Sequence, residues 1–317
     1  MSRPKLNHLV LVPRSGLANR MRAIAAARRL CQIAGARCTI VWDWGDYEAL
    51  FERNPDTEVL SRIPPDLAGR YLGIRSNLTG TDQRCVPLDG QAGIILTSQH
   101  CFGATTDAES LNEFDLLPWM PRPSQAVRDK VRLFKAKAFD SGGIVGMHMR
   151  RTDNKAARVL SCDWLFDRKA RAIVANGGLI YLATDNQATE TMMLARFAGH
   201  ILHLPKNPAR ARRWPRPFEV EETIADYADL LLLASCDHVL GSSDSSYSML
   251  AMALNGSPNC RTLRRLDSGD AGVVDRLRAP FHELRVLLFR LRQLARHRSA
   301  AEFAVAILQA LQRGRRA

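Results

Sequence analysis

The chain has 317 residues and a net charge of +13, with 45 Lys and Arg against 32 Asp and Glu. Hydrophobic residues make up 46% of it and charged residues 24%, a composition that excludes a disordered or fibrous chain and is typical of a globular protein. No apolar run approaches the roughly 18 residues of a membrane-spanning helix, and the N-terminus lacks a signal-peptide pattern, so we expect a cytoplasmic protein.

The first half of the chain predicts an α/β unit. A short apolar run at 8–13 indicates a strand, a Ser-Gly turn follows, and apolar residues then recur at helical spacing over 17–30. Further strands are predicted at 38–44 and 93–99. Residues 55–90 are rich in Pro, Gly and Asn, and we predict them to be irregular. The order strand, turn, helix, strand favours parallel strands.

The second half repeats this architecture after a mid-chain break. Pro121 and Pro123 precede a predicted helix that extends through Phe134, and a Ser-Gly-Gly segment ends it. The elements predicted after the break are strands at 143–149, 179–184, 200–204 and 237–242 and helices at 187–198 and 246–254. Two such halves predict two Rossmann-like domains that face each other across a cleft, with ligands bound beyond the carboxyl ends of the strands.

The predicted limits are 1–138 for the first domain, 139–268 for the second and 269–317 for a C-terminal segment. In that segment apolar residues recur at helical spacing beside several arginines, which predicts a basic amphipathic helix. Such a helix either binds an anionic membrane surface or packs its apolar side across a domain, and the second arrangement is the commoner. Peripheral contact with the inner face of the membrane is therefore one of two expectations.

The cysteine and arginine contents bear on the kind of site. The seven cysteines are scattered and form no C-x-x-C pair, which argues against a zinc site and against a disulfide framework. Of the 45 basic residues, 38 are Arg and 7 are Lys. This bias reflects either codon preference or phosphate binding. Phosphate binding would favour Arg because one guanidinium can bind two phosphate oxygens at once. The positive charge would also suit nucleic acid, but no recognition motif for it is present.

The most informative stretch is GMHMRRTD at 146–153. It begins as an apolar strand and places His148, two arginines and Asp153 at or beyond the carboxyl end of that strand. Strand alternation points Arg150 and Arg151 to opposite sides, so one can enter the cleft while the other braces the loop with Asp153. The alternative is a surface salt bridge at a strand end. After an apolar strand of an α/β domain, we favour phosphate binding.

A second candidate is the turn at 241–248, where five serines follow a glycine between a strand and an apolar helix. Backbone N–H groups and hydroxyls at such a turn favour an anion, as does the N-terminus of the helix. The alternative, an ordinary Ser or Asp helix cap, requires fewer serines. A diphosphate held here and by Arg150 would make a nucleotide site without a P-loop.

Two further stretches are weaker evidence for a binding site when each is taken alone. YLATDN at 181–186 indicates a strand that ends in a polar turn at Asp185. Acidic residues at 219–229 lie before and on the first turns of an apolar helix, where the preference for negative charge at a helix start explains most of them. Asp229 is the exception, because four leucines follow it directly, and its carboxylate could accept paired N–H bonds from a guanine edge.

Together these stretches resemble the α1,6-fucosyltransferases. HMRRTD matches their H-x-R-R-T-D motif, YLATDN resembles their Y-L-A-T-D-D stretch, and the segment from Asp229 to Ser246 fits in order and spacing. SGLANR at 15–20 resembles the Gly-x-x-Asn turn of the wider superfamily, which includes α1,2- and protein O-fucosyltransferases. The resemblance covers residues 140–260 and, in the first half, mainly this turn.

The resemblance implies a GT-B-like fold and a metal-independent, inverting transfer of fucose from GDP-fucose to a glycan or glycolipid hydroxyl, without a further cofactor. The first domain would face the acceptor and the second would bind the donor. Arg150 would grip the β-phosphate, Ser245 and Ser246 would hold the diphosphate, and Asp229 would read the guanine. The remaining donor-side residues that the resemblance implies are His148, Arg151, Asp185, Gly16 and Asn19.

One departure concerns the general base. In the animal enzyme a Glu shortly after the motif has this role, and the corresponding segment around Arg158 contains no Glu. Asp153, Asp43 or Asp46 could serve instead. The stretch WDWGD at 42–46 has the wrong spacing for a metal-binding D-x-D loop, so we expect no metal.

The leading hypothesis is thus a bacterial-type fucosyltransferase without a nucleic-acid partner. One alternative keeps the fold and changes the donor to another GDP- or UDP-sugar. The other, from a different class, is a basic nucleic-acid-binding protein whose Arg-rich C-terminal helix is the contact surface.

Overall fold

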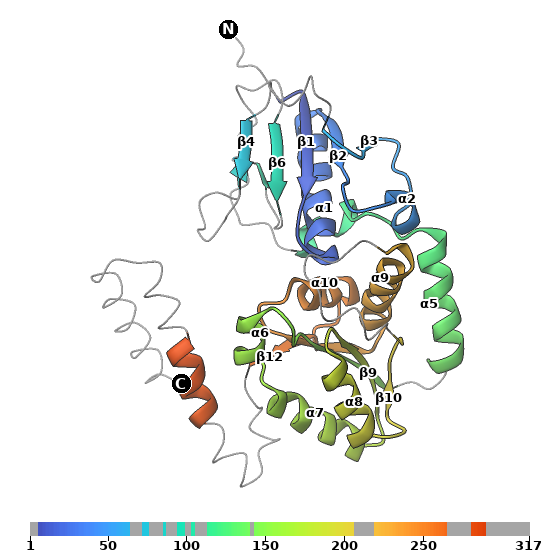
Figure 1. Ribbon diagram of the computed structural model, residues 1–317, viewed down its shortest axis with the longest axis vertical. Coiled ribbons are helices and arrows are strands. Elements are labelled where there is room, and N and C mark those ends of the chain that lie inside the picture. The colour runs from blue at the N-terminus through green and yellow to red at the C-terminus, as the bar shows by residue number, and fades with distance from the viewer. Residues whose placement is uncertain are drawn as a thin grey trace, which may run out of the picture.

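The computed structural model describes most of two parallel β-sheets and the helices that surround them (Figure 1). The residues described are 6–63, 72–75, 85–86, 94–98, 103–104, 113–139, 143–205, 219–264 and 280–289. Each of the two larger sheets has five strands, and the first half of the chain supplies one and the second half the other. The predicted α/β class is therefore confirmed, while the predicted cleft and domain limits remain predictions.

The first sheet has the strand order β3-β2-β1-β6-β4, and all its neighbours pair in parallel. Its strands are β1 (His8–Pro13), β2 (Arg37–Val41), β3 (Thr57–Leu60), β4 (Leu72–Arg75) and β6 (Ile94–Ser98). A separate pair joins β5 (Cys85–Val86) to β7 (Gly103–Ala104). The prediction of irregular structure at 55–90 was wrong where β3, β4 and β5 lie, because these short strands are held by pairing with distant segments rather than by a local apolar pattern.

Helix α1 (Leu17–Ala34) links β1 to β2, and 12 of its residues are buried. Gly35 ends it in a left-handed conformation, with φ of 65°, and its N–H contacts the last carbonyls of the helix. The other helices among the described residues of this half are α2 (Tyr47–Leu50), α4 (Glu113–Leu116), the 3-10 helix η2 (Leu117–Trp119) and α5 (Gln125–Ala138).

The second sheet has the strand order β10-β9-β8-β11-β12, again parallel throughout. Its strands are β8 (Ile144–Met149), β9 (Leu179–Thr184), β10 (Ile201–Leu202), β11 (His238–Ser242) and β12 (Arg261–Leu263). The helices described around it are α6 (Lys155–Leu160), α7 (Asp163–Ala175), α8 (Gln187–Arg196), α9 (Val220–Ala234) and α10 (Ser246–Asn255). Every residue of the central strand β8 is buried, as expected for a strand covered on both faces.

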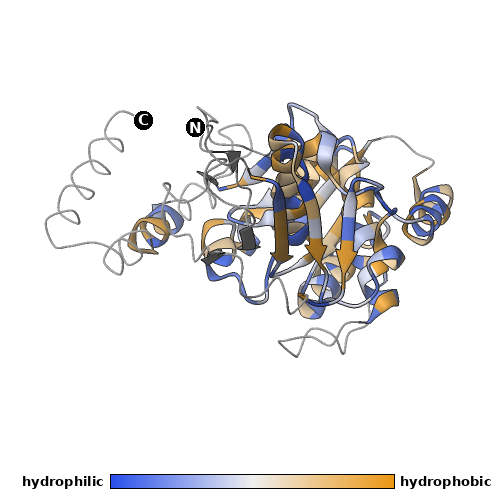
Figure 2. Cartoon of the chain, turned by 90° about the horizontal axis from the view of Figure 1, so that it is seen from above, coloured by the Kyte–Doolittle hydropathy of each residue, from blue (hydrophilic) through white to orange (hydrophobic). Residues whose placement is uncertain are grey.

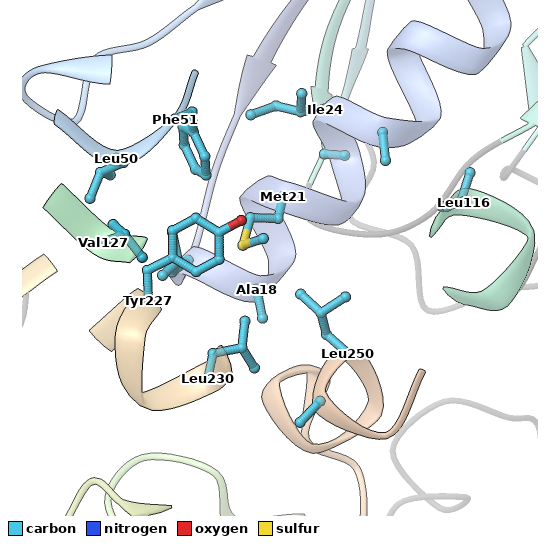
Figure 3. Close-up of a cluster of buried hydrophobic side chains, with 14 of the residues drawn as sticks. Ala18, Met21, Ile24, Leu50, Phe51, Leu116, Val127, Tyr227, Leu230 and Leu250 are labelled. Atoms are coloured by element: carbon cyan, nitrogen blue, oxygen red, sulfur yellow. The ribbon is translucent and has the colours of Figure 1, made fainter. Parts of the chain in front are cut away.

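The two halves share one apolar core (Figure 3). Ala18 and Met21 of α1 belong to the same buried cluster as Leu230 of α9 and Leu250 of α10. Tyr227 completes the contact: its ring lies 5.5 Å from that of Phe51, centroid to centroid, and its hydroxyl donates to the carbonyl of Pro121. The inward faces of α1, α9 and α10 therefore join the sheets into one packed unit.

Helix α5 also packs across this boundary. Ser124 caps its N-terminus, and Pro123 forms a bridge with Phe51 of the first half. Its Phe134 contacts Tyr181 of β9 at a centroid distance of 5.7 Å, and the helix packs along α9. The helix that was predicted to end the first domain therefore contacts both halves of the chain.

Of the C-terminal segment predicted at 269–317, the structure describes only residues 280–289, which are helical. Figure 2 shows both hydrophobic and hydrophilic residues on this helix. His282 faces inward, with its ring near Trp164 and hydrogen-bonded to the carbonyl of Arg264, whereas Phe281, Leu284 and Leu288 are exposed. One side of the helix therefore contacts the second half and the other presents apolar side chains to solvent.

Within the described residues, we find no helix with the length and apolar character that crossing a bilayer requires.

Candidate functional site

Three neighbouring strands of the second sheet end in polar residues. Strand β8 leads to Arg150, β9 leads to Asp185, and β11 ends at Ser242, and these strands lie side by side in the order β9-β8-β11. Because all three are parallel, their carboxyl ends lie at one edge of the sheet, which is where α/β folds bind ligands.

Arg150 is held at this edge from several directions. Its Nη1 lies 3.0 Å from Oδ2 of Asp185, and its Nη2 lies 2.6 Å from Oδ1 of Asp153. Its backbone N–H donates to Oγ of Ser242, which in turn donates to the carbonyl of His148. The side chain remains 31% exposed. Arg150 is therefore fixed in position while part of its guanidinium stays accessible to an anion.

Arg151 turns away from Arg150, as strand alternation predicted. It is buried, pairs with Asp163, and donates to the carbonyl of Ser161 at 2.8 Å. Its guanidinium lies 5.0 Å from the centre of the Phe166 ring. Arg151 thus braces the loop through Asp163, whereas Asp153 pairs with Arg150. Arg151 remains a predicted donor-side residue, and its contacts suit a supporting position.

Asp185 organises the loop after β8. Its Oδ1 accepts the backbone N–H of Arg151 at 2.7 Å, and its Oδ2 accepts the hydroxyl of Thr152 and pairs with Arg150. Burial disfavours the charged form, but the positive charge of Arg150 and the hydrogen bond from Thr152 hold the pKa of Asp185 below its usual range. The carboxylate is therefore ionised at neutral pH and fixes Arg150 by charge.

The serine-rich turn leads directly into α10. The hydroxyl of Ser245 accepts the N–H of Ser248 and caps the helix, while Ser246 is its first residue and is partly exposed. Asp244 just before it has φ of 57°, an uncommon conformation for a residue other than glycine. Gly241 allows α10 to approach β11, because a Cβ there would lie 2.6 Å from Cβ of Ser248. The N-terminus of α10 is therefore held close to the carboxyl end of β11, where its N–H groups favour an anion.

His148 lies beneath this turn. Its Nδ1 is 2.6 Å from Oγ of Ser248, and its ring lies 4.7 Å from that of Tyr247 at an interplanar angle of 35°. Sequence analysis did not single out Tyr247, because an aromatic residue on an apolar helix gives no signal of its own.

Asp229 is deeply buried, with 1% of its surface exposed. Its Oδ1 accepts the hydroxyl of Tyr181 at 2.6 Å and its Oδ2 that of Tyr247 at 3.2 Å. Burial and the neighbouring Asp229 charge raise the pKa of Tyr181 well above its ordinary value, so this hydroxyl stays protonated and donates. The structure therefore links Asp229 to His148 through Tyr247, a connection that the spacing in the sequence could not indicate.

The predicted turn of the first half lies at the end of β1. Gly16 precedes α1, and the side chain of Asn19 donates to Oγ of Ser15, which has φ of 73°. Arg20 donates to the carbonyl of Ser15 at 2.9 Å and pairs with Asp43 at 3.0 Å. Gly16 and Asn19 thus lie at the carboxyl edge of the first sheet.

The stretches at 15–20 and 42–46 and Asp43 were considered separately from the sequence, and their meeting around Arg20 was not predicted. Arg14 pairs with the other oxygen of Asp43, and the Arg20 guanidinium lies 5.2 Å from the ring centre of Trp42 and 4.9 Å from that of Trp44. A usable signal was present, because Arg14 directly follows the first predicted strand. In the described part of the chain, no group of three or more His, Cys, Asp or Glu side chains is suitable for a metal ion.

Solved structures of fucosyltransferases have the same fold. No protein-family model matches the sequence, and no curated protein matches it by sequence. NodZ α-1,6-fucosyltransferase soaked with GDP-fucose is 15% identical, with a TM-score of 0.51, and the match covers 79% of this chain and 93% of that one. NodZ from Bradyrhizobium is 16% identical with a TM-score of 0.50, covering 78% and 92%.

A variant of FUT1 from Arabidopsis thaliana in complex with GDP gives a similar result. It is 11% identical, with a TM-score of 0.52, and the match covers 83% of this chain and 70% of that one. Identities this low concern the path of the backbone rather than individual side chains. The resemblance predicted from HMRRTD is therefore confirmed at the level of the fold: this chain is built like the fucosyltransferases NodZ and FUT1.

Proposed function

We propose that the protein is a fucosyltransferase that transfers fucose from GDP-fucose to a hydroxyl of a glycan or glycolipid, with inversion and without a metal ion. The observation that carries this proposal is the placement of Arg150, held by Asp185 and Ser242 at the carboxyl edge of the second sheet in a fold like that of GDP-binding fucosyltransferases.

The diphosphate would lie between Arg150 and the N-terminus of α10. Arg150 supplies a guanidinium, and the first turn of α10 supplies N–H groups together with the hydroxyls of Ser245 and Ser246. As the bond from fucose C1 to the β-phosphate oxygen breaks, its electron pair moves to GDP. The same groups stabilise the negative charge that develops on GDP. In other glycosyltransferases a metal ion has this role.

The guanosine would extend toward His148 and Asp229. The carbonyl of His148 accepts the hydroxyl of Ser242, which also binds the backbone N–H of Arg150. Asp229 accepts the hydroxyl of Tyr247. Asp229 would read the guanine N–H groups only after local rearrangement, because 1% of its surface is exposed and its two oxygens already accept the hydroxyls of Tyr181 and Tyr247.

The acceptor hydroxyl must lose its proton as its oxygen attacks fucose C1. Asp153 is the carboxylate we assign to this step, because it contacts Arg150 directly and its side chain is 62% exposed. Asp43 is bound by two arginines, and Asp46 caps α2, so both are less suited to accept a proton.

Calorimetric titration with GDP, UDP and a random DNA duplex tests the proposal. We expect GDP to bind in the presence of EDTA, UDP to bind more weakly and DNA not to bind. Preference for UDP would favour a transferase with another donor. DNA binding with a steep salt dependence and no nucleotide binding would favour the nucleic-acid-binding alternative.

We also propose peripheral membrane contact through helix 280–289, because Phe281, Leu284 and Leu288 are exposed beside Arg285. Vesicles of anionic phospholipid should retain the protein on sedimentation, and those of zwitterionic lipid should not. Replacement of all three apolar residues by Ser should abolish retention. Retention that survives this change would refute the contact.

A further inference from the structure

The carboxyl edge of the first sheet carries a second cluster of charged and aromatic side chains. It consists of Arg14 after β1, Arg20 on the first turns of α1, and the loop at 42–46 after β2. The cluster lies in the first half of the chain, next to Gly16 and Asn19, whereas Arg150 and the serine-rich turn lie in the second half. Because β1 and β2 are parallel neighbours, their carboxyl ends bring these segments together at the edge where such sheets bind ligands.

Arg20 organises the cluster. It is almost fully buried, donates to the carbonyl of Ser15, and lies against the rings of Trp42 and Trp44 at 5.2 and 4.9 Å. These contacts fix the orientation of Trp44, which is half-buried and keeps part of its indole at the surface. A tryptophan held in this way is a rigid apolar platform.

Asp43 is the second component. One of its oxygens accepts from Arg20 at 3.0 Å, and the other pairs with Arg14. The side chains of Asp43 and Arg14 are nevertheless 32% and 51% exposed, and each carboxylate oxygen can accept more than one hydrogen bond, so Asp43 can accept from a further donor. An oriented carboxylate and a guanidinium beside an aromatic ring suit a pyranose, whose neighbouring hydroxyls both donate and accept and whose C–H face is apolar.

Helix α1 connects the cluster with α10, the helix that carries part of the proposed donor site. Helix α1 begins directly after Arg14, Ser15 and Gly16, and it packs against α10 in the shared core, where Ala18 and Leu250 belong to one cluster (Figure 3). The N-terminus of α10 is the part of the second half to which the diphosphate is assigned. A sugar on the 42–46 loop would therefore be held by the half of the chain that packs, through α1, against the half with the proposed diphosphate site.

We propose that Trp44 and Asp43, oriented by Arg20 and Arg14, form a subsite that holds a pyranose unit of the acceptor glycan by stacking on Trp44 and by hydrogen bonds to Asp43. The role of this subsite in binding the acceptor rests on the proposed function. Its ability to bind sugar is independent of catalysis.

Binding of the protein to an array of immobilised oligosaccharides, with chitooligosaccharides and oligomers of mannose, galactose and glucose, tests the subsite in the presence of GDP. We expect at least one glycan to bind. Trp44→Ala and Asp43→Asn should each weaken its binding by about tenfold, the effect of losing one stacking or charged contact, and Trp44→Phe should restore most of it. Asp46→Asn is the matched control, because Asp46 lies in the same loop and Asn also caps a helix.

Calorimetric GDP affinity and melting temperature are measured for the same variants. Unchanged GDP affinity beside lost glycan binding supports the subsite. Wild-type protein that binds no glycan, or glycan binding that survives both Trp44→Ala and Asp43→Asn, would overturn it. Loss of GDP binding by the wild type would instead refute the proposed function, so the two failures are distinguishable.

Discussion

At the scale of single residues, Arg150 carries the proposed chemistry. Its two terminal nitrogens contact different carboxylates, Asp185 and Asp153, and a lysine cannot span both. We expect Arg150→Lys to lower turnover by about 100-fold or more, as for loss of a preorganised donor, with an unchanged melting temperature. Transfer assays with GDP-fucose measure the effect. Arg158→Lys, an exposed change on α6, is the control, and wild-type turnover by Arg150→Lys would remove Arg150 from the site.

Two substitutions test whether Asp229 binds the guanine. If it reads the guanine, Asp229→Asn should weaken calorimetric GDP binding by roughly 1.5 to 3 kcal/mol, because an amide turns a donor toward a donor. Tyr247→Phe keeps the carboxylate and removes only the hydroxyl that shares Oδ2, so GDP affinity should fall much less. Equal GDP affinity in the wild type and both variants, with lowered melting temperatures, would show that Asp229 only supports the core.

At the scale of elements, the approach of α10 to β11 depends on Gly241. Gly241→Ala places a Cβ 2.6 Å from Cβ of Ser248, and we expect it to reduce the free energy of unfolding by about 1–3 kcal/mol and to weaken GDP binding. Gly16→Ala is the matched control for stability alone, at the strand–helix turn after β1, where no atom lies within 4 Å of the added carbon. Urea denaturation of both variants measures the free energy of unfolding. If both variants lose the same amount, the contact of the added Cβ with Ser248 is not what destabilises Gly241→Ala.

Elements also show where prediction from the sequence succeeds. The bounds of β1 and β9 were predicted because each is an apolar run that a polar turn ends. Strands β3 and β4 have four residues each and owe their existence to parallel partners far away in the chain, so no local pattern marks them. The same reason applies to the site, where Tyr181 and Asp229 lie 48 residues apart and meet only after folding.

At the scale of the whole molecule, the shared core predicts that both halves unfold together. Leu250→Ala removes a buried side chain from the cluster that joins α10 to α1, and we expect a loss of about 2–5 kcal/mol in a single calorimetric transition. Met249→Ala, at an exposed position beside it, should change stability little. Two separate transitions, with only one shifted by Leu250→Ala, would contradict a common core.

The buried contact of Tyr227 with Phe51 and Pro121 also limits how the protein can move. A hinge that swung the sheets apart would expose this ring and the leucines around it to water, at a large cost in free energy. Domain closure is therefore an unsuitable way to admit the donor and release GDP. We expect turnover to depend on local rearrangement of the loops that carry Arg150 and Asp43. Because no domain closure precedes binding, the rate constant for nucleotide association should approach the diffusion limit.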